Sequence, residues 1–287
     1  ADMLNRRGHS VTVYERDRRP GGLLMYGIPN MKLDKAVIAR RTRLMEAEGV
    51  TFVTGTDVGR DVTLEALAAQ FDAIVLCCGA KLPRDLAVPG RDADGVFFAV
   101  DYLRGVTEKV IGETQDFTVT AAGKNVVIVG GGDTAMEDAL YLARFASKVT
   151  IIHRRDSFRA AQALVRRVQQ TPNVKILYHT VVKALRGEEQ LEEIVVQNTL
   201  SGAESAFRTQ GLFVAVGTVP QTELLAGQLA LQEGYVIAGE DTRTSVCGVY
   251  AAGDIRTKPL RQVICAASDG AVAAAMVQAD LNSIEIG

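Results

Sequence analysis

Residues 125–159 read NVVIVGGGDTAMEDALYLARFASKVTIIHRRDSFR, and this stretch decides the fold. The apolar run at residues 126–129 leads into three glycines at residues 130–132, which a helical pattern follows. A second apolar run, residues 149–152, ends in the basic tripeptide at residues 153–155. Strand, glycine turn, helix and strand in this order predict the first half of a dinucleotide-binding βαβ unit.

The residue types of the glycine turn each have a physical reason. Gly130 permits a tight turn, Gly132 lets the backbone approach a diphosphate, and Ala135 is small enough for the helix to pack closely on the strand. The start of the helix offers free N–H groups and the positive end of its dipole to that diphosphate. The alternative is an ordinary glycine-rich turn. The candidate cofactor-binding residues of the turn are Gly130, Gly131, Gly132, Asp133 and Thr134.

The end of the second strand indicates which dinucleotide binds. An acidic residue there would accept hydrogen bonds from a ribose 2′-hydroxyl. This chain instead has His153, Arg154 and Arg155, with Arg159 four residues further on. Guanidinium groups match phosphate oxygens, so these four residues favour NADPH over NADH as the cofactor. The alternatives are a solvated charge run or, because Asp156 is close by, the unphosphorylated cofactor.

Length and composition restrict the class of protein. The 287 residues are enough for two domains, and 47% of them are hydrophobic, so sizeable cores are possible. The net charge is −2 without a long basic tract, which argues against a nucleic-acid partner. We expect no bilayer-spanning run and a cytoplasmic location.

The four cysteines show no metal-binding spacing, so we predict no metal site and buried, reduced thiols: Cys77, Cys78, Cys247 and Cys265.

The chain repeats part of this unit near its start. Residues 10–16 match residues 148–154, but here the strand ends in Glu15, which suits an unphosphorylated adenosine ribose. The match places the glycine turn and leading strand of this first copy before Ala1. Because a sheet without a central strand exposes apolar edges, we expect poor stability or weakened cofactor binding. A cooperative melt with tight stoichiometric flavin binding would refute that expectation.

Two further glycines follow buried-strand patterns. Gly79 ends the run at residues 72–79, and Gly217 ends the similar run at residues 211–217. Both join the candidate cofactor-binding residues. We expect residues 106–122 to cross between domains.

Several motifs resemble those of two-dinucleotide-binding flavoprotein reductases. The centre and C-terminal part are similar to thioredoxin reductases, in the segments GGGDTA (130–135), HRRDSFR (153–159), AAGD (251–254) and PLRQ (259–262). The N-terminal third resembles the small subunit of glutamate synthase, in YER (14–16), GGLL (21–24), YGIP (26–29) and KLDK (32–35). Such a split resemblance fits a divergent member or an artificial fusion joined near residues 121–125.

The resemblance implies an α/β fold with two Rossmann-like three-layer domains, the NADPH domain inserted in the FAD domain. The FAD domain would comprise residues 1–105 and 236–287 and lack its first strand. The NADPH domain would comprise residues 120–225, with connections at 106–119 and 226–235. Residues implied to contact FAD are Glu15, Arg16, Gly22, Leu23, Val58, Gly253, Asp254, Arg261, Gln262 and Val263.

The function implied is hydride transfer from NADPH to FAD and electron delivery to an unidentified protein or small-molecule acceptor. We predict no acid–base catalytic side chain, because the cofactors carry the chemistry. Family members tend to be dimers or subunits of larger assemblies. The chain lacks the Cys-x-x-Cys pair of thioredoxin reductases and the iron–sulfur cysteines of glutamate synthase small subunits. The alternatives are a disulfide reductase whose dithiol was lost, or a non-catalytic, engineered or chimeric dinucleotide-binding scaffold or fragment.

Overall fold

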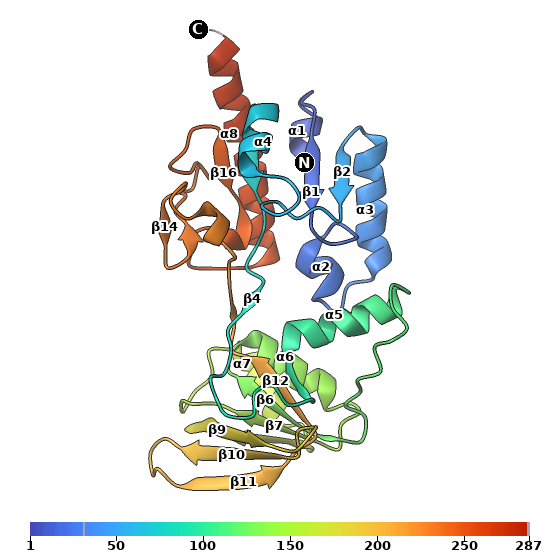
Figure 1. Ribbon diagram of the computed structural model, residues 1–287, viewed down its shortest axis with the longest axis vertical. Helices are drawn as coiled ribbons and strands as arrows, with labels where there is room; N and C mark the ends of the chain where they lie inside the picture. The colour runs from blue at the N-terminus through green and yellow to red at the C-terminus, as the bar shows by residue number, and fades with distance from the viewer. Residues whose placement is uncertain (31, 286–287) are drawn as a thin grey trace. The chain divides into compact units, whose positions relative to one another are not determined.

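The computed structural model describes residues 1–30 and 32–285 and divides into two compact units (Figure 1). Unit 1 comprises Ala1–Leu82 and Thr218–Gly287, and unit 2 comprises Pro83–Gly217. The inserted arrangement of the second unit within the first agrees with the expected fold. The short strands β4 (Leu82–Pro83) and β13 (Thr218–Val219) pair where the chain passes from one unit to the other.

A five-stranded parallel sheet forms the centre of unit 2, in the order β5-β12-β6-β7-β8. The register of β6 on β7 starts with Asn125 opposite Lys148. Because both faces of the sheet are covered, its strands are near-continuous apolar runs. The parallel strands are β5 (Val96–Phe98), β6 (Asn125–Gly130), β7 (Lys148–Ile152), β8 (Val174–Leu177) and β12 (Gly211–Ala215).

Alternating residues of β6 point into two different cores. Val126 and Ile128 pack in a cluster with the helices, whereas Val127 packs with the antiparallel sheet β11-β10-β9. Unit 2 therefore has three layers, in which the parallel sheet lies between helices and an antiparallel sheet (Figure 1). The outer elements are α5 (Ala99–Val110), α6 (Asp133–Leu142), α7 (Gln162–Gln169), β9 (Thr180–Arg186), β10 (Glu193–Asn198) and β11 (Glu204–Arg208).

The division of the chain by its contacts differs from the expected domain boundaries near residues 105, 120 and 225–236. The contacts divide the chain after Leu82 and after Gly217. The reason is that β5 pairs with β12 and that Tyr102 of α5 packs in the core of unit 2, with its ring 4.9 Å from that of Phe213. The segment expected to cross between domains is therefore partly helical, because α5 continues to Val110.

The parallel strands of unit 1 form two separate pairs, β1 with β2 and β3 with β16. By the sequence repeat, β1 corresponds to β7 of unit 2, and β2 pairs with β1 in parallel as β8 pairs with β7. Within the part of the chain that the structure describes, unit 1 has no strand in the position of β6. These strands are β1 (Thr12–Glu15), β2 (Thr51–Thr54), β3 (Ile74–Leu76) and β16 (Val249–Ala251).

Both faces of the β3–β16 pair are covered. Tyr250 and Ala252 pack on Ala273 and Val277 of α8, while the opposite face packs on residues from the segment between β13 and β16. The remaining elements of unit 1 are α1 (Asp2–Asn5), α2 (Gly22–Tyr26), α3 (Lys35–Ala47), α4 (Leu64–Gln70), η1 (Glu223–Leu225), β14 (Leu231–Gln232), β15 (Tyr235–Val236), η2 (Gly253–Ile255) and α8 (Val263–Glu285).

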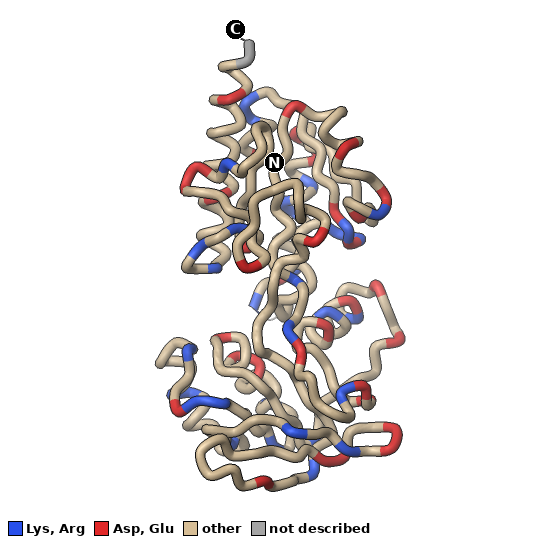
Figure 2. The backbone as a smooth tube through the Cα atoms, turned by 60° about the vertical axis from the view of Figure 1, so that its left-hand side comes forward, with Lys and Arg blue, Asp and Glu red and all other residues tan. Residues whose placement is uncertain are grey.

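Helix α8 differs from our expectation that the chain has no run long and apolar enough to span a bilayer. Over Val263–Ser283 it is long and apolar enough, by length and composition alone, to cross a membrane, whereas we expected no such run. One such helix is by itself weak evidence for a membrane segment, and 22% of its apolar window is buried in unit 1, including Ala273, Ala274 and Val277. Figure 2 shows acidic and basic residues interspersed along the chain within each unit.

Candidate dinucleotide-binding site

The glycine turn, residues 130–133, connects β6 to α6 as the sequence predicts. None of its three glycines has a positive φ, so the need for glycine is steric and not conformational. A Cβ on Gly130 would lie 2.6 Å from the Ala215 oxygen and 2.7 Å from the Ala135 Cβ. A Cβ on Gly131 would lie 2.2 Å from the His153 ring, whereas a Cβ on Gly132 would have nothing within 4 Å. Gly132 is therefore the open position of the turn.

These distances predict a loss of stability for one of two similar substitutions and no change for the other. Gly130→Ala forces a methyl group against backbone and Ala135, and overpacking of this kind destabilises a protein by about 1–3 kcal/mol. Gly132→Ala fits the open space at a φ of −96°, so we expect an unchanged melting temperature. Thermal unfolding of the two variants checks this pair. Equal melting temperatures for both would contradict the packing described for Gly130.

The arginine loop, residues 153–161, is hydrogen-bonded along its length to the glycine turn. The Arg159 N–H donates to the Gly131 oxygen at 2.9 Å, and the Ala161 N–H donates to Asp133 Oδ1 at 2.7 Å. Arg154, Arg155 and Arg159 are all exposed. The structure therefore brings the predicted basic residues and the predicted glycine turn together at the carboxyl ends of β6 and β7.

His153 differs from the expectation of a phosphate ligand. Its side chain is buried, with Nδ1 3.1 Å from the Gly130 oxygen and Nε2 2.8 Å from the Ser157 oxygen. The Phe158 ring lies against it, with centroids 4.7 Å apart. Because both ring nitrogens already contact carbonyl oxygens, His153 holds the loop together and does not face a ligand. Thr134, a candidate of the glycine turn, is exposed in the first turn of α6.

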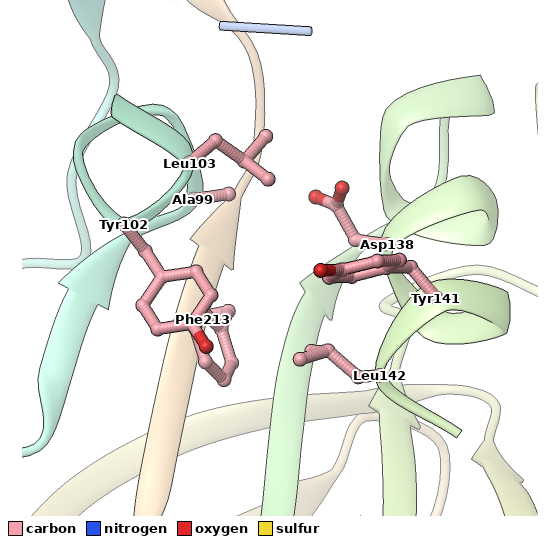
Figure 3. Close-up of a pocket in the computed structure, with 7 residues that line it drawn as sticks. All are labelled: Ala99, Tyr102, Leu103, Asp138, Tyr141, Leu142 and Phe213. Atoms are coloured by element: carbon pink, nitrogen blue, oxygen red, sulfur yellow. The ribbon is translucent and has the colours of Figure 1, made fainter. Parts of the chain in front are cut away.

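A small cavity in unit 2 lies away from the glycine turn, between α5, α6 and β12 (Figure 3). Its volume of about 10 Å³ is near the minimum for a single water molecule. It is therefore a packing defect and not a nucleotide site. Its lining residues are Ala99, Tyr102, Leu103, Asp138, Tyr141, Leu142 and Phe213.

In unit 1, Glu15 ends β1 and its carboxylate accepts a hydrogen bond from the Asp17 N–H at 3.0 Å. The Glu15 oxygen also accepts from the Thr56 N–H, which brings the loop containing Val58 beside the end of β1. Arg16 is exposed and donates to Gln221 Oε1 at 3.2 Å. Three of the predicted residues therefore lie around the carboxyl end of β1.

Gly22 begins α2 with a φ of +51°, and Leu23 is 51% exposed. The loop that follows is held by Lys35, which the sequence analysis names only within the KLDK segment and gives no role. The buried Lys35 ammonium donates to the Leu24 oxygen at 2.8 Å and to the Ile28 oxygen at 2.6 Å, and burial lowers its pKa. Lys35 thereby fixes the segment that presents Gly22 and Leu23.

Two glycines lie just beyond the ends of strands and have positive φ, 68° for Gly79 and 98° for Gly217. Gly79 belongs to unit 1 and follows β3. Gly217 belongs to unit 2, and its oxygen accepts a hydrogen bond from the Arg84 N–H at 3.0 Å. The predicted pair is therefore divided between the two units.

A buried ion cluster supports the loop that contains Gly253 and Asp254. Asp269 of α8 accepts hydrogen bonds from the Gly253 N–H at 2.9 Å, from Arg256 Nε at 2.9 Å and from Lys258 Nζ at 2.6 Å. Burial raises the pKa of the Asp254 carboxyl, and the nearby cations of Arg261 and Lys258 oppose this. Sequence reasoning missed Asp269, although it is the one charged residue within residues 263–277.

The start of α8 presents the last group of predicted residues. The Arg261 guanidinium lies 4.0 Å from the centroid of the Tyr235 ring, and its buried Nε has no hydrogen-bond partner among the described residues. Gln262 and Val263 are exposed. An orphaned buried donor beside exposed polar and apolar groups fits a site that a polar, planar ligand completes.

The cysteines differ from the expectation that all four are core residues. Cys77, Cys78 and Cys247 are exposed and Cys265 is half-buried, all as free thiols. The reason is that β3 ends at Leu76, so that Cys77 and Cys78 lie beyond the last paired residue of the strand.

Comparison with known proteins agrees with the geometry. Residues 1–270 match the model of the family described as pyridine nucleotide-disulphide oxidoreductase. The glutamate synthase [NADPH] small chain of Bacillus subtilis is 34% identical over 89% of this chain and 60% of that protein. The thioredoxin reductase of Streptomyces clavuligerus is 45% identical over 70% of this chain and 60% of that protein. The chain thus spans about 60% of the length of these two curated relatives.

The fold is also that of solved thioredoxin reductases. The structure of the Lactococcus lactis enzyme matches with a TM-score of 0.80 at 24% identity, over 98% of this chain and 94% of that chain. The expected α/β fold and both resemblances are confirmed by these matches. The chain therefore belongs to the pyridine nucleotide-disulphide oxidoreductase family.

Proposed function

We propose that the chain is an NADPH-dependent FAD oxidoreductase in which unit 2 binds NADPH. The observation that carries this proposal is the arginine loop, held against the glycine turn by the bond from the Arg159 N–H to the Gly131 oxygen. The turn and the start of α6 offer N–H groups to the diphosphate. Arg154, Arg155 and Arg159 are exposed cations that match the 2′-phosphate by charge and shape.

Unit 1 supplies the residues that would hold FAD. Glu15 would bind the adenosine ribose, Val58 would contact the adenine region through its backbone, and Gly22 and Leu23 would line the flavin site. Gly253 and Asp254 would contact the pyrophosphate and ribityl chain, and Arg16 and Gly79 are further candidate contacts. Arg261, Gln262 and Val263 would contact the isoalloxazine edge, where the orphaned Arg261 Nε offers a donor. Bound FAD supplies the ability to accept a hydride from NADPH and to pass electrons on.

The candidate functions of the chain differ in the molecule that accepts electrons from the flavin. The relatives named above include glutamate synthase small chains and thioredoxin reductases. This chain has no Cys-x-x-Cys pair, so we propose an acceptor that receives electrons without a dithiol of this chain. A glutamate synthase-like role, as a subunit or homodimer in the cytoplasm, fits best. A non-catalytic dinucleotide-binding scaffold is the alternative.

The absorbance of bound flavin, with and without reduced nicotinamide cofactor, distinguishes the oxidoreductase from the non-catalytic scaffold. Purified protein with added FAD is expected to retain yellow flavin, which NADPH bleaches faster than NADH does under anaerobic conditions. A disulfide substrate such as 5,5′-dithiobis(2-nitrobenzoate) is then expected to give no turnover above that of free flavin. Colourless protein that still binds NADPH would support the scaffold. Equal bleaching by NADH and NADPH would contradict the assignment of the arginine loop.

A further inference from the structure

The arginine loop contacts the glycine turn at three places along its length. His153 at its start contacts the Gly130 oxygen, the Arg159 N–H two residues before its end donates to the Gly131 oxygen, and the Ala161 N–H at its end donates to Asp133 Oδ1. An exposed loop with several cations would otherwise sample many conformations. Three attachments to one four-residue turn fix both segments relative to each other.

The His153 ring lies between the arginine loop and the glycine turn and contacts both. The ring nitrogens Nδ1 and Nε2 lie within hydrogen-bond distance of the Gly130 and Ser157 oxygens, at 3.1 Å and 2.8 Å. The ring is 9% exposed and occupies the space that a side chain at Gly131 would need. His153 therefore joins the glycine turn to the middle of the arginine loop through one rigid group.

Asp133 also attaches the arginine loop to the glycine turn, through its side chain. It begins α6, where a carboxylate is commonly a favourable first-turn charge. Here Oδ1 accepts a hydrogen bond from the Ala161 N–H, the N-cap residue of α7. Since Ala161 has no capping side chain of its own, Asp133 caps α7 from the start of α6 and ties the two helix starts together.

We propose that His153 and Asp133 are positioning residues that fasten the arginine loop to the glycine turn, so that the diphosphate and 2′-phosphate subsites form as one unit. This inference rests on the proposed binding of NADPH to unit 2. A positioning role for His153 can be distinguished from a role as a phosphate ligand by its effect on the two cofactors. A 2′-phosphate ligand affects only the phosphorylated cofactor, whereas a positioning residue affects both cofactors.

Calorimetric titration with NADP⁺ and NAD⁺ distinguishes the two roles. His153→Phe keeps a ring beside Phe158 and removes the polar contacts to the Gly130 and Ser157 oxygens. Its affinity for both nucleotides is expected to fall about tenfold, the effect of losing one net hydrogen bond from the junction. A loss confined to NADP⁺ would make His153 a phosphate ligand, and unchanged affinities would also overturn the proposal. If the wild-type protein shows no preference for NADP⁺, the proposed function fails instead.

Amide hydrogen exchange tests the attachment without any nucleotide and without a change in the buried ring. In Asp133→Ala, the amides of residues 159–161 are expected to exchange at least about tenfold faster than in the wild type. The matched control is Asp156→Ala, which removes the same charge from the loop itself, where Asp156 accepts a hydrogen bond from Ser157 Oγ. Equal exchange in the two variants would show that Asp133 does not fasten the loop.

Discussion

Replacing Asp269 with alanine is expected to destabilise unit 1 by about 3–5 kcal/mol, the cost of leaving buried cations without their partner. The side chains of Arg256 and Lys258 are only 5% and 7% exposed, so water cannot replace the lost carboxylate. The Gly253 N–H loses its acceptor as well. Because a domain has only about 5–15 kcal/mol of stability, this single change removes a large fraction of it.

Chemical denaturation of Asp269→Ala measures this loss. The matched control is Asp61→Ala, in which the removed carboxylate pairs with the exposed Arg60 and accepts a hydrogen bond from the Asp57 N–H, both at the surface. We expect that control to unfold at the same denaturant concentration as the wild type, because exposed pairs contribute little. Equal unfolding midpoints for Asp269→Ala and the wild type would contradict a stabilising role of the buried cluster.

The same cluster predicts how stability responds to acid. Burial alone raises the pKa of Asp269, but hydrogen bonds from Arg256, Lys258 and the Gly253 N–H outweigh it and hold the pKa below its ordinary range. A depressed folded-state pKa gives stability that is present above the unfolded pKa of about 4 and is lost as the pH falls below it. Denaturation followed from pH 7 to pH 3 checks this, and Asp269→Ala should show a weaker decline.

Replacing both Arg154 and Arg155 with alanine is expected to lower the affinity for NADP⁺ about 100-fold while leaving NAD⁺ binding nearly unchanged. Charge-assisted hydrogen bonds contribute about 1.5–3 kcal/mol each, and both side chains are exposed at the carboxyl end of β7. The selective loss follows because the two nucleotides differ only in the 2′-phosphate. Titration calorimetry with both nucleotides measures it.

The control for the arginine variant is the double alanine variant of Arg166 and Arg167. These residues are exposed on α7 of the same unit, so their removal changes the net charge equally. If the control loses as much NADP⁺ affinity, the effect is one of general charge, and the arginine loop does not bind the phosphate.

The part of the site that follows from short-range sequence was predictable. The strand, glycine turn, helix and strand of residues 125–152 are adjacent in sequence, and their apolar spacing and small residues reveal them without any tertiary information. The steric role of Gly130 and Gly131 was not predictable. It depends on the Ala215 oxygen of β12 and on the His153 ring, which follows the end of β7.

For the same reason, features that depend on contacts between residues far apart in the sequence could not be predicted from the sequence. The position of β5 beside β12 sets the domain boundary, but nothing in residues 96–98 alone indicates that partner. The roles of Asp133 and Asp269 likewise depend on which amide or cation the fold brings to each carboxylate. An isolated charge in an apolar helix was the available signal for Asp269.

The insertion of unit 2 within unit 1 has a consequence for synthesis on the ribosome. Unit 2 is one continuous segment, so it can fold as soon as residue 217 has left the exit tunnel. Strand β3, at residues 74–76, must wait for its partner β16, at residues 249–251. At translation rates of about 5–20 residues per second, that wait lasts roughly 10–35 s. We expect the early half of unit 1 to depend on chaperones during this interval.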